Sequence, residues 1–275
     1  MNKKYWTILF LLLPVLAYSQ NLYNSVNSKK FANFLYNSQE YALAAAEFER
    51  ISFLDSSDFQ SGYMLLKSYR KSQQYNKGLR RAESFLATPE FLTSKLQNEY
   101  VFLLIKNGSY SKAGQFLGEK SKIPSGQKDF LQLSMLLMYG DYQKAGIVGG
   151  NIGESADVKT VGLKRLASEA ALIEFKNPGL SLVLSGVVPG LGKVYAGQWK
   201  DGLISFLFIG AAVYQAYRGF DKKGTSSAYG WIYAGLGTGF YLGNLYGSYK
   251  AVNKYNHKQR HDIYHRTEKI FDSMD

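Results

Sequence analysis

A glycine-rich stretch at residues 185–202, SGVVPGLGKVYAGQWKDG, has the composition of a phosphate-binding loop. A Walker-type loop has the form G-x-x-x-x-G-K-[ST], in which backbone N–H groups and the lysine hold the phosphates and the hydroxyl ligates magnesium. Here five residues, not four, separate Gly186 from Gly192, and Val194 stands where the hydroxyl is needed. We therefore predict no nucleotide site, and the proline and glycines need another explanation.

The three histidines of the chain, His257, His261 and His265, are spaced four residues apart in HKQRHDIYH. On a helix they share one face, and imidazoles at i and i+4 can bind one metal ion. Lys258, Arg260 and Arg266 beside them oppose a bound cation, and no glutamate completes an H-E-x-x-H motif. These residues are therefore weak metal candidates. A pH-sensing face is a second hypothesis, and a basic helix lying on anionic headgroups is the interpretation that we favour.

Other sets of catalytic residues are missing from the sequence. The chain has no cysteine, which excludes disulfides, thiolate metal sites and thiol nucleophiles. No Ser–His–Asp set can be assembled from the three clustered histidines, and paired carboxylates such as Glu47 and Glu49 are typical of a solvated helix face. We predict that the protein is not an enzyme and needs no cofactor.

The N-terminus predicts export. Two lysines precede the apolar run 5–16, and Ala17 and Ser19 are the small residues that signal peptidase requires, so residues 1–19 are interpreted as a signal peptide cleaved after Ser19. An uncleaved N-terminal anchor is the alternative, for which the run is short. In an exported chain the net charge of +12 favours anionic lipid surfaces or acidic proteins as partners over nucleic acid.

Four stretches, SQEYALA, SQQYNKG, NGSYSKA and YGDYQKA, recur at intervals of 34, 35 and 32 residues. Each has a tyrosine followed three positions later by a small residue. The pairs are Tyr41 and Ala44, Tyr75 and Gly78, Tyr110 and Ala113, and Tyr142 and Ala145. This pattern resembles the tetratricopeptide repeat, a helix–turn–helix unit of about 34 residues. The resemblance implies that the tyrosine opens the second helix and that the small residue lets the two helices approach.

Residues 25–150 thus contain about four tetratricopeptide-like repeats, and an amphipathic helix within 151–177 is expected to cap them or link them to the rest. One repeat cannot bury its apolar face alone, so the units are expected to stack into a solenoid. The resemblance implies a concave surface that binds a protein or peptide partner. An array that serves only as a spacer is the alternative.

The composition changes after Pro178, where three apolar stretches follow at 180–196, 203–217 and 228–249. The last comes nearest to the ~20 residues that a membrane-spanning helix needs. A small residue recurs in it every four positions, at Gly235, Gly239, Gly243 and Gly247. In lipid such a stripe lets another helix approach to backbone contact. The partner is either the helix expected at 203–217 or a second copy of the chain, which would give a homo-oligomer.

The glycine-rich stretch of the opening resembles the PG-x-G-x-x-Y-x-G signature of small bacterial membrane domains built on a two-helix hairpin. The matching residues are Pro189, Gly190, Gly192, Tyr195, Gly197, Asp201 and Gly202. The resemblance covers residues 178–256 and implies no known chemistry. A backbone break at membrane depth needs partners within the protein, so we expect a re-entrant or kinked turn packed against two helices. Three spans are the alternative, which the basic polar tail at 257–275 favours.

These observations predict an all-α protein, with a tetratricopeptide-like helical solenoid followed by an α-helical membrane hairpin. The predicted function is a membrane-anchored scaffold of the cell envelope, with a protein or peptide and membrane lipid as partners. Helical spans favour the inner membrane of a two-membrane bacterium, because outer-membrane proteins form barrels. The alternative is a glycine-stripe oligomer that forms a pore or assists membrane insertion, with the repeats regulatory.

Overall fold

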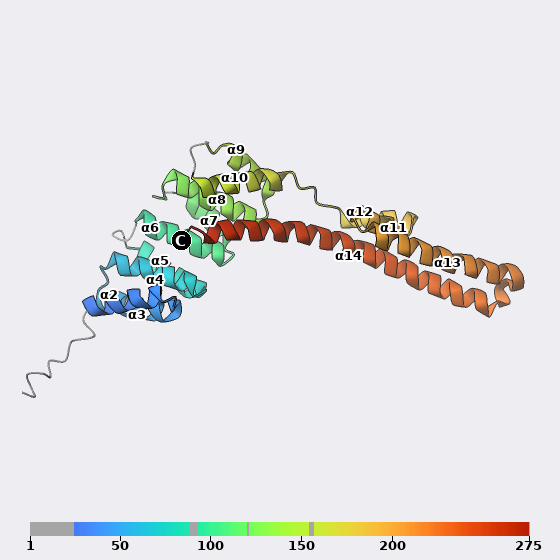
Figure 1. Cartoon of the computed structure of the whole chain (residues 1–275), viewed down its shortest axis with the longest axis horizontal. Helices are drawn as coiled ribbons and strands as arrows, with labels where there is room; N and C mark the ends of the chain where they lie inside the picture. The colour runs from blue at the N-terminus through green and yellow to red at the C-terminus, as the bar shows by residue number, and fades with distance from the viewer. Residues whose placement is uncertain (1–24, 89–92, 120, 154–156, 275) are drawn as a thin grey trace, which may run out of the picture. The chain divides into compact units, whose positions relative to one another are not determined.

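The structure is a computed structural model of the chain and describes residues 25–88, 93–119, 121–153 and 157–274. These residues form α-helices and one 3-10 turn, without a β-strand among them, so the predicted all-α class is confirmed (Figure 1). The predicted signal peptide lies outside the described residues. The chain divides into two compact units, Met1–Met135 and Leu136–Asp275. This boundary falls inside a helix, earlier than the boundaries at residues 150 and 177 that the sequence suggested.

The helices of residues 25–150 follow one another in pairs. They are α2 (Ser25–Asn37), α3 (Tyr41–Leu54), α4 (Phe59–Lys71), α5 (Tyr75–Leu86), α6 (Ser94–Lys106), α7 (Tyr110–Gly118), α8 (Ser125–Tyr139) and α9 (Tyr142–Gly150). The repeat tyrosine is the first residue of the second helix in every pair, and Ala44, Ala113 and Ala145 are fully buried. At Gly78 a Cβ would lie 2.9 Å from a methyl carbon of Leu103, so a small residue is needed there.

The two helices of each pair are joined by the same left-handed turn. The residues two positions before the repeat tyrosines, Gln39, Gln73, Gly108 and Gly140, have φ angles of 63°, 59°, 73° and 92°. The next N–H group donates to the carbonyl five residues earlier, as at 2.9 Å from Gln74 to Tyr69, which is the Schellman arrangement. Glycine adopts this conformation without strain but glutamine does not, so the first two turns are strained.

A buried ion pair links two helix pairs of the first unit. The guanidinium of Arg70 on α4 bonds to the carboxylate of Glu99 on α6, and both side chains are almost completely buried. The Arg70 guanidinium carbon also lies 4.8 Å from the centre of the Phe102 ring. Leucines and aromatic residues such as Phe48 and Phe130 fill the surrounding core. The charges are therefore removed from water but remain paired, which makes loss of one partner costly.

The second unit contains the end of α8, α9 and the remaining helices. These are α10 (Val158–Ala171), α11 (Pro178–Val187), α12 (Leu191–Tyr195), α13 (Trp199–Lys223), the 3-10 turn Gly224–Ser226 and α14 (Ala228–Asp272). The helix expected within 151–177 is α10, which contacts both α9 and α14. Asn177 caps α11 through its side chain, with Pro178 in the first turn, where a missing N–H group costs nothing.

The basic C-terminal region differs from the expected separate tail. Residues 257–272 continue α14 without a break. Ile263, Thr267 and Phe271 are buried, and Arg266 donates to both carboxylate oxygens of Glu169 on α10 at 2.6 Å. The apolar side chains that a headgroup-bound helix would present to lipid are therefore already buried in the protein.

Candidate functional site

One helical segment among the described residues, Trp199–Ser226, is long and apolar enough to cross a membrane, with a mean hydropathy of 1.2 over its best window. This segment is α13 and the turn after it, not the stretch 228–249 that the sequence favoured. The preceding helix α11 has ten residues, a rise of about 15 Å, which is half of the ~30 Å hydrocarbon core. By length, α11 is too short to span.

The helices α13 and α14 contact each other along a line of small side chains. The buried and half-buried positions along them alternate three and four residues apart, as in a coiled-coil seam. On α13 they include Gly202, Ser205, Ile209, Ala212, Ala216 and Gly219, and on α14 they include Gly230, Ala234, Gly237, Tyr241, Asn244, Ser248 and Ala251. Among them Gly237 meets Ala212 of α13, whereas Gly202 meets α12, and Asn244 and Ser248 bond to α11 and the turn after it. The backbones come close together at Gly219, where a Cβ would lie 2.7 Å from Cα and N of Gly230.

The predicted glycine stripe lies elsewhere on α14. A Cβ at Gly235, Gly239 or Gly243 would meet no atom within 4 Å, while one at Gly247 would lie 3.0 Å from Cε of Lys193. The hypothesis that the stripe packs against α13 is therefore wrong. The buried positions of the seam repeat every seven residues, whereas the glycines of the stripe repeat every four. The stripe therefore turns away from the seam along the helix. The second copy of the chain remains as a hypothetical partner for the stripe.

The break between α11 and α12 is held by buried polar side chains. The N–H group of Gly190 donates to Asn244 Oδ1 at 3.0 Å, and that of Gly192 donates to Ser185 Oγ at 2.9 Å. Ser181 Oγ lies 3.0 Å from the Ser248 carbonyl oxygen, and the hydroxyls of Ser185 and Ser248 are 2.6 Å apart. These side chains replace the hydrogen bonds that a continuous helix would supply, as expected for a break without water.

Two glycines of the signature are needed for close backbone approach. Gly190 has φ 89°, and a Cβ there would lie 2.0 Å from the carbonyl oxygen of Gly202. At Gly192 a Cβ would lie 2.2 Å from the carbonyl oxygen of Ser181. Pro189 immediately precedes this contact, in the turn at the end of α11. The signature therefore describes a tight reversal of the chain.

The remaining signature residues fix the ends of α12 and α13. Gly197 has φ 85° in open space and turns the chain after α12. Asp201 lies in the first turn of α13, where the negative charge of a carboxylate interacts favourably with the helix dipole. The Tyr195 hydroxyl accepts from the Asn177 backbone at 3.1 Å, and Lys176 Nζ donates to the Tyr195 carbonyl at 2.7 Å. These contacts tie the segment before α11 to the end of α12.

The same geometry explains why residues 185–202 do not form a phosphate loop. The N–H groups of Gly190 and Gly192 are already bonded to side chains of this unit. Lys193 Nζ donates to Ser205 Oγ at 2.7 Å. Neither the amides nor the lysine is arranged around an open site for a phosphate.

The histidines lie on one exposed face of α14, as their spacing predicted. His257 and His261 line a cavity of about 370 Å³ together with Arg260, Tyr264 and Tyr142. Arg260 also lies over the ring of Phe175, at 5.1 Å. Among the described residues no group of three histidine or carboxylate side chains is placed to hold a metal ion.

Sequence reasoning missed the buried polar side chains at Ser181, Ser185, Asn244 and Ser248. Their spacing could have indicated them, since Ser181 and Ser185, and likewise Asn244 and Ser248, are four residues apart within an apolar stretch.

Comparisons of this chain with protein-family models, with curated proteins and with solved structures found no match.

Proposed function

We propose that the protein is a membrane-anchored scaffold of the cell envelope. In this proposal residues 25–150 form a tetratricopeptide-like solenoid that binds a protein or peptide, and α13 and α14 form a membrane hairpin. The segment α11–α12 is a re-entrant element that enters the membrane and returns to the same side. The proposal includes neither catalytic chemistry nor a cofactor.

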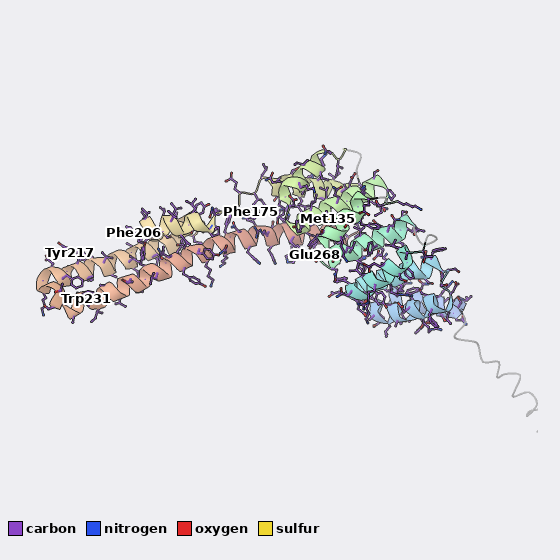
Figure 2. All side chains as sticks on the ribbon, turned by 180° about the vertical axis from the view of Figure 1, so that it is seen from behind. Met135, Phe175, Phe206, Tyr217, Trp231 and Glu268 are labelled. Atoms are coloured by element: carbon purple, nitrogen blue, oxygen red, sulfur yellow. The ribbon has the colours of Figure 1, made fainter. Side chains whose placement is uncertain are left out.

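The observation that best supports a membrane anchor is the reversed polarity of residues 178–252. Its polar side chains face inward, with Ser181, Ser185 and Ser248 fully buried. Many of its large apolar side chains face outward, among them Phe206 (Figure 2). Phe206 and Leu207 are 50% and 58% exposed. A water-soluble protein has the opposite arrangement, and exposed apolar surface of this extent is typical of a membrane or protein interface.

The binding role of the repeats is supported by exposed aromatic residues. Phe31 and Phe34 lie on α2 at i and i+3, and Phe53 at the end of α3 is 87% exposed. Aromatic side chains are enriched at protein interfaces, where they bury large area. A protein or peptide partner would remove these side chains from water.

Cysteine labelling in intact cells tests the topology, because the chain has no native cysteine. We expect Ser72→Cys and Ser273→Cys to react with a membrane-impermeant maleimide from outside the inner membrane, and Ser226→Cys to be protected. A protected Ser72 position would exclude an exported repeat region. Labelling at Ser226 with protection at Ser273 would instead indicate that α11–α12 spans the membrane.

Site-specific photo-crosslinking in the full chain tests the scaffold role. A crosslinking amino acid at Phe34 or Phe53 should capture a discrete envelope partner, whereas one at Lys112, which is exposed on α7, should not. Equal capture from all three positions, or capture from none, would contradict specific binding through these aromatic residues.

The alternative function, a glycine-stripe oligomer that forms a pore, is favoured by one observation. Gly235, Gly239 and Gly243 face open space, so a helix of a second copy would meet no obstruction from this chain. Replacement of Gly239 and Gly243 by leucine should then abolish oligomers and conductance in reconstituted vesicles. A wild-type chain that is monomeric in mild detergent would exclude this alternative.

A further inference from the structure

An open cavity of about 430 Å³, which we call the tip cavity, lies where α13 is joined to α14. Its polar lining consists of Gln215, Arg218, Lys222, Lys223, Ser226 and Ser227. The close contact of Gly219 with Gly230 brings the two helices together below it. Gly224, with φ 57°, turns the chain between α13 and α14. The volume lies within the usual range of small-ligand sites, about 300–1,000 Å³.

The lining of the tip cavity is positively charged and lacks a carboxylate. Arg218, Lys222 and Lys223 all contribute to it, and none of them forms an ion pair with a carboxylate in the part of the chain that the structure describes. Asp221 stands between them in the sequence but does not line the cavity. Three uncompensated cations around one hollow produce a strong local preference for an anion.

A neutral donor adds to this preference. Ser227 is only 3% exposed, and its Oγ accepts from the Gly230 N–H at 3.0 Å, which leaves its hydroxyl hydrogen free to donate. The loop around this hydroxyl is held in place, because Trp231 Nε1 donates to the Thr225 carbonyl at 3.0 Å and Ser226 Oγ donates to the Lys223 carbonyl at 2.7 Å. Tyr229 is also tied to Gln215, with 3.2 Å between the hydroxyl and Oε1. Gln215, Ser227 and Tyr229 of the lining are thus held by hydrogen bonds.

The cavity lies at the end of the apolar segment of α13, next to aromatic side chains. Tyr217 and Trp231 lie where α13 turns into α14 (Figure 2), and both are more than half exposed. In a membrane protein, tyrosine and tryptophan collect at the level of the lipid headgroups. If the hairpin spans the membrane as proposed above, the tip cavity is at that level.

We propose that the tip cavity binds the phosphate group of an anionic phospholipid. Arg218 and the two lysines pair with the phosphate oxygens, the Ser227 hydroxyl donates to them, and the acyl chains lie along the exposed apolar face of α13. This inference depends on the proposed membrane hairpin for its lipid source. Its phosphate chemistry depends only on the residues of the cavity.

Lipid binding by the full chain in detergent tests the proposal without requiring a bilayer. The probe is phosphatidylglycerol in mixed micelles, compared with phosphatidylcholine, and the readouts are the unfolding temperature and the lipid retained in native mass spectra. The test variant is Arg218→Gln/Lys222→Gln/Lys223→Gln. The matched control is Lys250→Gln/Lys254→Gln/Lys258→Gln, which removes the same charge from exposed positions of α14.

We expect phosphatidylglycerol to stabilise the wild-type chain and the control, and the tip variant to bind it about tenfold more weakly or worse, since each charge-assisted bond contributes strongly. Equal losses in both variants, or no loss in the tip variant, would overturn the proposal. Ser227→Ala, which keeps every charge, should also weaken binding, and unchanged binding in this variant contradicts the proposed donor.

A second arm separates lipid from free phosphate. Inorganic phosphate, compared with chloride at equal ionic strength, should stabilise the wild-type chain far less than the lipid. If it stabilises equally and only through the tip residues, the lipid source is overturned and the cavity is a site for soluble phosphate. A wrong assignment of the membrane hairpin would be recognised separately. In that case alkaline carbonate would release the protein from membranes, whatever the result of the lipid-binding measurement.

Discussion

Replacement of Gly219 by alanine should destabilise the contact between α13 and α14, whereas the same change at Gly239 should not. The two positions differ in their surroundings and not in their backbone, because both glycines lie inside long helices. A Cβ at Gly219 would lie 2.7 Å from the backbone of Gly230, which cannot move aside as a flexible side chain can. A Cβ at Gly239 would meet nothing within 4 Å.

The magnitude follows from two opposing effects. Alanine is favoured over glycine in a helix by about 1 kcal/mol, and this gain applies at both sites. Overpacking against fixed atoms costs about 1–3 kcal/mol, and this cost applies only at Gly219. The propensity gain cancels when the variants are compared, so Gly219→Ala should be less stable than Gly239→Ala by about 1–3 kcal/mol.

The assay is unfolding of the full chain by sodium dodecyl sulfate in mixed micelles, followed by tryptophan fluorescence. Trp231 lies close to the affected contact, since its ring packs edge-on against Phe220 with 5.3 Å between the ring centres. Wild-type protein should fall between the two variants. Equal stability of the two variants, or a lower stability of Gly239→Ala, would refute the assignment of the seam and restore the stripe as the contact with α13.

Three further predictions concern the repeats, the break and the C-terminal end of α14. Gln73→Gly should raise the free energy of unfolding by up to about 1 kcal/mol in urea, because glycine relieves the left-handed strain, and Gly108→Ala should lower it for the same reason. Asn244→Leu should lower it by about 1–3 kcal/mol in detergent unfolding, because it leaves a buried N–H group without an acceptor. The hydrogen bonds from Arg266 lower the pKa of Glu169 below its ordinary value of 4.5, so the stabilisation is complete at neutral pH and is lost as the pH falls through the folded pKa. Since both side chains are largely exposed, Glu169→Gln should cost no more than about 1 kcal/mol at neutral pH, and a cost that persists at acid pH would contradict this account.

The sequence was sufficient to predict the helical class and the paired helices of residues 25–150. Both depend on local interactions, namely the 3.6-residue periodicity of apolar residues and a turn repeated at a fixed interval. Each repeat tyrosine does begin the second helix of its pair, because the left-handed turn two residues earlier ends the first helix. The signature residues around Pro189 also proved to lie in one tight reversal.

The tertiary structure alone decided which residues meet across the second unit. The glycine stripe was conspicuous in the sequence, but α14 meets α13 at Gly230 and Gly237 instead. A helix carries several possible stripes, and the one that is buried depends on the surface of its neighbour. The partners in the polar contacts around Asn244 are more than fifty residues apart in the chain. Spacing within one segment predicts a face of a helix, but only the folded chain determines what that face contacts, because burial depends on groups brought from distant parts of the sequence.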